Sequence, residues 1–140
     1  MALTFADMVK AINSRFYNQV ESVVSAFIGK VFYDGVEFDS IPKNSVYVRF
    51  TVLPGRTEQV SLGENKRFRT IGIAIAQIFA PLGTNPNTVW GYTDSIKTAF
   101  RSTDADGVVY RTPYVSNLNR EDAYFRLNVT IPFYADDVES

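Results

Sequence analysis

The sequence contains neither cysteine nor histidine among its 140 residues. Without these residues the chain has no thiol nucleophile, no disulfide, no histidine general base and almost no means of binding zinc or haem. Phosphate-binding loops are missing as well, because Gly29-Lys30 lacks an upstream glycine and neither Gly55 nor Gly63 precedes a Lys-Ser or Lys-Thr pair. We therefore expect no enzyme activity, no catalytic residue, no metal ion and no cofactor.

A strong net charge and a long apolar run are also missing. The formal net charge is −1, which argues against a general nucleic-acid-binding protein. No apolar run approaches the roughly 20 residues of a membrane-spanning helix, and the N-terminus lacks the pattern of a signal peptide. With 46% hydrophobic residues, we expect residues 1–140 to form one globular domain, made in the cytoplasm and not inserted in a membrane.

The clearest secondary-structure pattern lies at Phe68–Pro81 and predicts a long central β-strand. Odd positions from 71 to 75 carry isoleucine, whereas even positions from 72 to 76 carry glycine or alanine. Both faces are apolar, so we expect both to be covered, the small residues by a helix and the isoleucine row by a core. At about 3.3 Å per residue the strand spans roughly 40 Å, which is comparable to the whole domain.

Two helices are predicted, one on each side of this strand in the sequence. Thr4 and Asp7 form a capping box for an amphipathic helix that ends by Gly29. Its apolar stripe consists of Phe5, Val9, Ile12, Phe16, Val20, Val23 and Phe27. Asn85 and Pro86 begin the second helix. The apolar face of that helix consists of Val89, Thr93, Ile96 and Phe100.

Further strands are predicted along the chain. The dipeptide Asp34-Gly35 favours a hairpin of short edge strands, and residues 45–53 alternate as a half-buried strand that stops at Pro54-Gly55. Residues 108–115 and 125–133 predict two C-terminal strands. The sequence therefore predicts an α+β fold, in which two helices pack on one face of a four- to five-stranded antiparallel or mixed sheet.

Acidic clusters are the remaining candidates for chemistry. Residues 104–107, DADG, resemble the start of a calcium loop, but the later ligands are absent and a turn is predicted. Asp34, Glu37 and Asp39 are expected to be solvated at a hairpin tip. A hydrolase that uses only carboxylates is an alternative, and would need two acids about 5 to 10 Å apart in a pocket. A monomeric regulatory or inhibitor domain is a further alternative.

A polar stretch between the two long strands is the candidate interaction site. Residues 55–66 form a connection longer than two adjacent strands require, and long polar loops of this kind are usually either functional or disordered. Basic residues follow it at the start of the central strand. We expect a subunit or partner interface at Arg56, Glu58, Gln59, Val60, Leu62, Glu64, Lys66, Arg67 and Arg69.

Six short motifs follow one another along nearly the whole chain. They are AINSRF at 11–16, VYVRF at 46–50, QVSLG at 59–63, RTIG at 69–72, IFAPLGT at 78–84 and IPFY at 131–134. In order and spacing these motifs resemble the tail terminator proteins of long-tailed phages. The resemblance implies a small α+β subunit that forms a ring, typically six-fold, and caps the finished tail tube at its head-proximal end.

The resemblance also implies a set of partners. These are other copies of the chain, the tail tube protein and the head-tail connector or neck protein, while DNA passes through the ring without sequence-specific binding. Residues 55–66 and the start of the central strand would face neighbouring subunits or the tube. The protein would be made in the host cytoplasm and incorporated in the virion. Neck and head-completion proteins are related alternatives.

Overall fold

A computed structural model describes residues 4–34, 45–59, 68–101, 104–105, 107–121 and 124–136. The elements, in chain order, are α1 (Phe5–Phe16), the π-helical turn η1 (Tyr17–Glu21), the 3-10 turn η2 (Ser25–Phe27), β1 (Val31–Tyr33), β2 (Tyr47–Gln59), β3 (Phe68–Pro81), α2 (Pro86–Phe100), β4 (Asp104–Ala105), β5 (Val108–Tyr110), β6 (Tyr114–Glu121) and β7 (Tyr124–Asp136).

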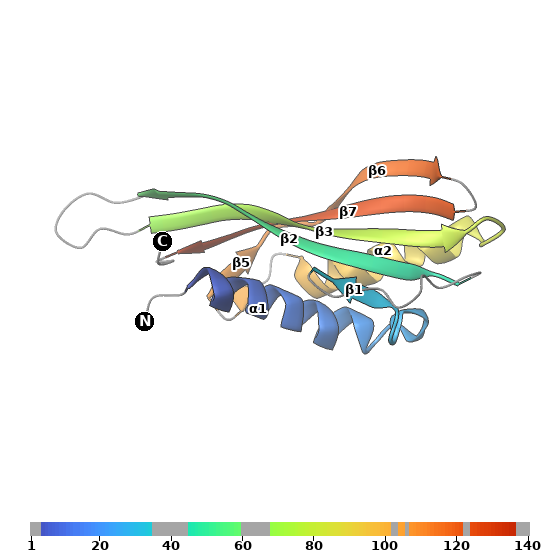
Figure 1. The fold of residues 1–140 in the computed structure, drawn as a ribbon, viewed down its shortest axis with the longest axis horizontal. Helices are drawn as coiled ribbons and strands as arrows, with labels where there is room; N and C mark the ends of the chain where they lie inside the picture. Colours follow the sequence, from blue (N-terminus) through green and yellow to red (C-terminus); the bar gives the residue numbers. More distant parts are fainter. Residues whose placement is uncertain are drawn as a thin grey trace.

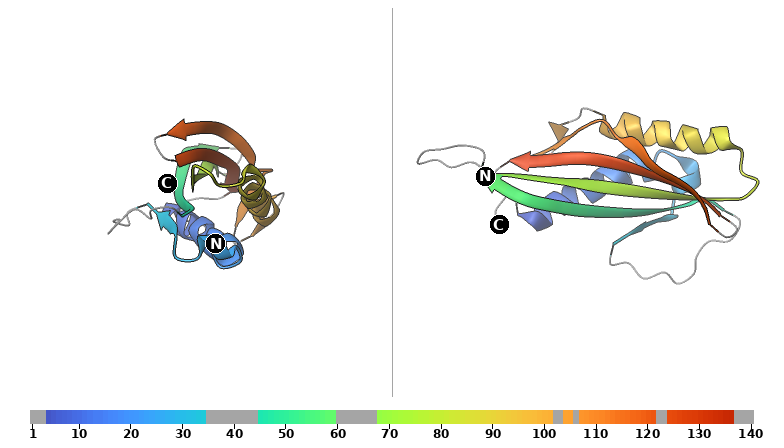
Figure 2. Two further views of the ribbon diagram at one scale, coloured as in Figure 1. Left: turned by 90° about the vertical axis from the view of Figure 1, so that its right-hand side faces the viewer. Right: turned by 90° about the horizontal axis from the view of Figure 1, so that it is seen from above.

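The strands form one mixed sheet, and both helices lie on the same face of it (Figures 1 and 2). The strand order is β1-β2-β3-β7-β5-β4, and β6 also pairs with β7. The predicted α+β class is therefore confirmed. The sheet has seven strands rather than four to five, because the short strand β4 was predicted as a turn and the region predicted as one strand at 108–115 is divided between β5 and β6.

Strand β3 is the centre of this sheet and has the predicted bounds, Phe68–Pro81. It pairs antiparallel with β2 on one side, and on the other side it pairs with β7 from Arg69↔Asp136 to Pro81↔Tyr124. Pairing on both sides along nearly its whole length explains why such a long strand is stable.

The two faces of β3 have different surroundings. Ala74, Ala76 and Ile78 are fully buried in the core on the side of the helices. The small side chains of the two alanines allow the helices to approach the sheet closely. The isoleucine row points to the opposite face, here called the outer face, and Ile71 is 52% exposed. The expectation that both faces are covered was therefore wrong for the described residues, whose two helices both lie on the small-residue side.

Strand β2 continues beyond Pro54-Gly55, where the sequence predicted its end. A register shift between Pro54 and Thr57 marks a β-bulge, after which pairing with β3 resumes to Gln59. A Cβ atom at Gly55 would lie 2.1 Å from the carbonyl oxygen of Ile71, so a glycine is required for this close approach. The first five residues of the predicted loop thus belong to β2, and residues 60–67 lie outside the described residues.

Helix α1 begins as predicted and ends much earlier. The hydroxyl oxygen of Thr4 accepts from the amide of Asp7 at 3.0 Å, and the amide of Thr4 donates to the Asp7 carboxylate at 3.3 Å. The α-helix stops at Phe16, and the chain continues through η1 and η2 towards Gly29. The β-branched residues at positions 20, 23 and 24 weaken helical propensity, which accounts for the early end.

Most of the predicted apolar stripe is buried although the α-helix ends early. Ile12, Phe16, Val20 and Phe27 of the stripe are fully buried as predicted, whereas Phe5 is 40% and Val23 is 69% exposed. Met8, which was not part of the stripe, is fully buried as well. In the core, the ring of Phe16 stacks on that of Phe50 of β2 with centroids 4.2 Å apart. No helix in the described part of the chain is long and apolar enough to cross a membrane.

The second half of the chain follows the prediction at α2 and departs from it afterwards. The side chain of Asn85 accepts from the amide of Asn87 at 2.9 Å, and proline occupies the first turn, as predicted. Residues 104–105 form β4 rather than a turn, and β5 ends at Tyr110 rather than at residue 115. Strand β6 was not predicted.

Strand β1 occupies one edge of the sheet, as expected for a short edge strand. It pairs with β2 in parallel, with Val31↔Val48 and Tyr33↔Phe50. The second strand of the hairpin predicted around Asp34-Gly35 falls at residues 36–38, outside the described residues.

Candidate partner interface

The distal ends of β2 and β3 bring together those candidate residues that the structure describes. Glu58 pairs with Arg69 across the two strands, and Gln59 pairs with Phe68. Arg56 and Glu58 follow the β-bulge on β2 and are exposed. The remaining candidates, which are Val60, Leu62, Glu64, Lys66 and Arg67, lie outside the described residues.

Arg56 and Glu58 form an exposed ion pair at this end of the molecule. The Arg56 Nη2 atom lies 2.6 Å from Glu58 Oε1, and the two side chains are 84% and 48% exposed. The hydrogen bond to Glu58 raises the pKa of the Arg56 guanidinium. Exposed ion pairs contribute little to stability, so both side chains can exchange this contact for one with a partner.

Arg69 makes close contacts with β7, whereas the sequence predicted only an exposed basic residue at the start of β3. Its Nε donates to Asp136 Oδ1 at 2.7 Å, and its Nη2 donates to Oδ2 at 3.2 Å. The guanidinium also lies over the ring of Tyr134, 4.2 Å from the centroid. The hydrogen bond to Asp136 raises the pKa of Arg69. Arg69 therefore joins β3 to β7 as well as contributing charge to the candidate site.

The sequence reading missed Asp136 and Tyr134, which lie in the last strand. Both residues lie beyond residue 133, where the sequence predicted the last strand to end. A signal was present, since Arg69 lies at the start of β3 and Asp136 at the end of β7, and antiparallel pairing brings these two ends together. Below the tip, the hydroxyls of Thr57 and Thr70 lie 2.7 Å apart and connect β2 to β3 just beyond the bulge.

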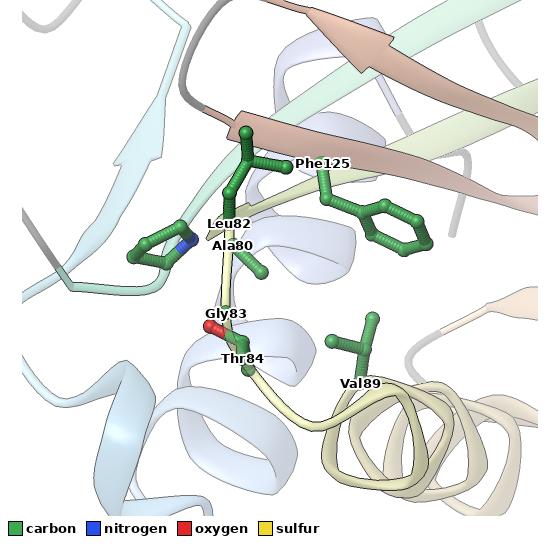
Figure 3. Close-up of a pocket in the computed structure, with 7 residues that line it drawn as sticks. Ala80, Leu82, Gly83, Thr84, Val89 and Phe125 are labelled. Atoms are coloured by element: carbon green, nitrogen blue, oxygen red, sulfur yellow. The ribbon is translucent and has the colours of Figure 1, made fainter.

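A small apolar pocket of about 70 Å³ lies at the other end of β3, beside the start of α2 (Figure 3). Its side chains come from the end of β3, the following turn, α2 and β7. The lining residues are Ala80, Pro81, Leu82, Gly83, Thr84, Val89 and Phe125. No ionisable side chain lines this pocket, and the hydroxyl in its lining belongs to Thr84.

A second, open hollow lies beside η1 and β1. It is lined by Asn13, Ser14, Tyr17, Asn18 and Tyr33, with no carboxylate among them. Asp34 instead accepts a hydrogen bond from the Thr51 hydroxyl at 3.1 Å. Within the described ranges no three potential acidic metal ligands come together. Neither hollow therefore has the pair of acids that a carboxylate hydrolase requires.

Comparisons with known proteins agree with the architecture. A family model described as phage tail terminator protein matches residues 9–133. Fifteen solved chains match the fold. One of them has a TM-score of 0.62 at 16% sequence identity, over 89% of this chain and 92% of its own. No curated protein matches. Because the family match spans most of the sequence and nearly all of the described secondary structure, the chain belongs to the phage tail terminator protein family.

Proposed function

We propose that this chain assembles into a closed ring, six-fold by resemblance, that caps the tail tube and joins it to the head-tail connector. Residues 1–140 act as one structural domain without catalytic activity. DNA passes through the ring without sequence-specific contacts, and the protein occupies the head-proximal end of the tail in the virion. The observation that carries the proposal is the family match over residues 9–133.

Surface features of the described residues support an assembling subunit. The outer face of the sheet carries exposed aliphatic side chains, including Leu53 at 47% and Ile71 at 52%. Monomeric proteins rarely expose contiguous apolar surface of this kind without a partner. Contacts between two different surfaces of one chain close into a ring when the rotation between copies closes.

Electron microscopy of the purified protein mixed with tail tubes tests this function. We expect a ring-shaped density at one end of each tube, and native mass spectrometry should give the number of subunits in the ring. A protein that is strictly monomeric both alone and with tubes would contradict the proposal. Rings that bind the connector but never the tube would instead identify a neck or head-completion protein.

We propose that the tip of β2 and β3, with residues 55–66 and Arg67, contacts the tube or the neighbouring subunits. Shortening the chain within residues 60–66, with the β2 residues up to Gln59 that pair with β3 kept, should leave the melting temperature nearly unchanged. Closure entropy changes by only about 0.6 kcal/mol per doubling of loop length. The same variant should lose tube capping. Capping equal to that of the parent would place the interface elsewhere.

Variants that change the charge of the tip are informative only if an effect on partner binding can be told apart from a loss of stability. Arg67→Glu is the simpler test, whereas Arg69→Glu would also break the contact with Asp136 between β3 and β7. The exchange Arg69→Asp with Asp136→Arg keeps an ion pair between the strands and serves as the matched control. We expect the exchange to restore the melting temperature that Arg69→Glu lowers without restoring tube capping.

A further inference from the structure

The outer face of the sheet carries an aliphatic patch, here called the outer-face patch. It consists of Leu53 on β2, Pro132 on β7, and Ile71, Ile73 and Ile75 on β3. In the sheet register, Leu53, Ile73 and Pro132 stand directly side by side. An antiparallel sheet whose second face meets water usually carries polar residues there, so this patch is typical of a face that becomes buried.

The outer-face patch has polar borders at both ends of the strands. At one end, Arg69 and Asp136 form their ion pair at 2.7 Å. In the other direction along the strands, the exposed Arg49 stands beside Gln77 in the register, and the stacked rings of Tyr47 and Phe79 follow. An apolar centre with a polar rim is the usual anatomy of a protein-protein interface. A surface facing DNA would instead carry charge across its centre.

Exposed apolar side chains also lie on the opposite side of the subunit, on residues 17–28, here called the Tyr17–Ile28 surface, among exposed polar residues. Tyr17 is 52%, Val23 is 69% and Ile28 is 59% exposed. The segment follows α1 and lies below the sheet, on the helical side of the molecule (Figure 1). The chain therefore exposes apolar side chains in two different places, on the outer face of the sheet and on the helical side.

We propose that the outer-face patch of one subunit packs against the Tyr17–Ile28 surface of the next copy, an inference that rests on the proposed ring. Two different surfaces in repeated contact are what a heterologous, ring-closing interface requires. Strands β2, β3 and β7 are 13 to 14 residues long. At usual strand spacings the whole outer face of these strands, the patch together with its polar borders, covers about 600 Å², close to the roughly 800 Å² that each partner buries in a standard interface.

The absence of cysteine from the sequence allows a direct test by cross-linking. The full chain with both Ile71→Cys and Val23→Cys is incubated with tail tubes and a short bismaleimide linker. Each copy then offers one thiol on each side, so we expect a covalent ladder that extends beyond the dimer. Ile71→Cys alone and Val23→Cys alone should stay monomeric under denaturing conditions.

The outcomes separate this inference from the proposed function. Rings seen by electron microscopy without a covalent ladder would overturn the contact and leave the ring intact. Dimers of Ile71→Cys alone would also overturn it, because the patch would then pair with itself. The absence of rings in the parent protein with tubes would reject the proposed function and this contact together.

A second pair of variants checks the contact without a cross-linker. Leu53→Glu places a charge in the outer-face patch and should reduce the fraction of assembled subunits at least tenfold at equal concentration. Its melting temperature as a monomer should change little, because Leu53 is already 47% exposed. Thr98→Glu, at an exposed position on α2, is the control and should assemble like the parent. Unchanged assembly of Leu53→Glu would contradict the proposed contact.

Discussion

Arg15 of α1 connects the two helices through the end of α2. Its guanidinium donates to the carbonyl oxygen of Ala99 from both Nε and Nη2, at 2.9 and 2.7 Å. The same group lies over the rings of Phe100 and Tyr110, 5.8 and 5.6 Å from their centroids. A cation at the C-terminus of a helix interacts favourably with the helix dipole. Arg15 of α1 therefore caps the C-terminus of the neighbouring helix α2.

Replacing this residue should lower stability without changing the fold. We expect Arg15→Met to reduce the free energy of unfolding by about 1.5–3 kcal/mol, the usual range for hydrogen bonds to a charged group. Urea denaturation followed by circular dichroism measures the change. Lys10→Met, at an exposed position of the same helix, is the control and should be nearly neutral. Equal stability of the two variants would show that the Arg15 contacts contribute nothing.

Tyr33 should give the protein a distinct alkaline behaviour. Its hydroxyl donates to Glu21 at 2.9 Å, and burial together with this hydrogen bond raises the pKa of Tyr33 above its ordinary value of 10.0. The unfolded chain therefore ionises first as pH rises. The stability that Tyr33 contributes is present below about pH 10 and is lost progressively above it.

A spectrophotometric titration of the phenols tests this expectation. Tyr33 should ionise only at a pH well above the exposed tyrosines, and Tyr33→Phe should reduce the amplitude of the late ionisation by one phenol. The variant should also lose less unfolding free energy between pH 10 and the alkaline transition. Tyr114→Phe, at a side chain 51% exposed, should leave the late step in place. Ionisation of Tyr33 together with the exposed tyrosines would contradict the assignment.

At the scale of elements, the two faces of β3 should respond differently to the same substitution. Ile78 is fully buried in the core, so Ile78→Ala should cost about 2–5 kcal/mol of unfolding free energy. Ile73 is half-buried on the outer face, and Ile73→Ala should cost the monomer only about 1 kcal/mol. Urea denaturation of the two variants makes the comparison within one strand. Equal losses would mean that the outer face is covered in the monomer.

The β-bulge in β2 depends on two glycines where the backbones approach closely. A Cβ atom at Gly72 would lie 2.6 Å from the Leu53 carbonyl oxygen and 2.8 Å from Phe133 Cζ. We expect Gly55→Ala and Gly72→Ala each to destabilise the protein by about 1–3 kcal/mol. Gly91 in α2 has no atom within 4 Å of such a Cβ, so Gly91→Ala should stabilise by about 0.5–1 kcal/mol. Thermal melting of the three variants measures these changes in stability.

The sequence predicted elements whose signals are local. Phe68–Pro81 has the predicted bounds because its apolar run is bordered by basic residues and by turn residues. Capping residues likewise marked the starts of both helices. Pro54-Gly55 was a misleading local signal, because pairing with β3 extends β2 beyond it. Of the candidate site, Arg56 and Glu58 could be assigned to the tip, but the contact of Arg69 depends on Asp136, 67 residues away.

At the scale of the whole molecule, stability should decrease from the centre of the sheet towards its edges. Strand β3 is flanked by β2 and β7, whereas β1 lies at an edge and pairs over only three residues. We expect amide hydrogen exchange to be slowest in β3 and much faster in β1 and β5. Exchange followed by mass spectrometry or NMR provides the measurement. Uniform protection across the sheet would indicate that it opens as a single cooperative unit.

The pairing of β3 with β7 also has a consequence for the order of synthesis. Strand β3 ends at Pro81 and its partner begins at Tyr124, with α2 and strands β4, β5 and β6 between them. On the ribosome, β3 therefore emerges well before the strand that pairs with its second edge. Until β7 follows, that edge and the alanines of its core-facing side stay available to other nascent chains, which favours aggregation. Chaperone dependence should consequently be greatest for nascent chains stalled between α2 and β7.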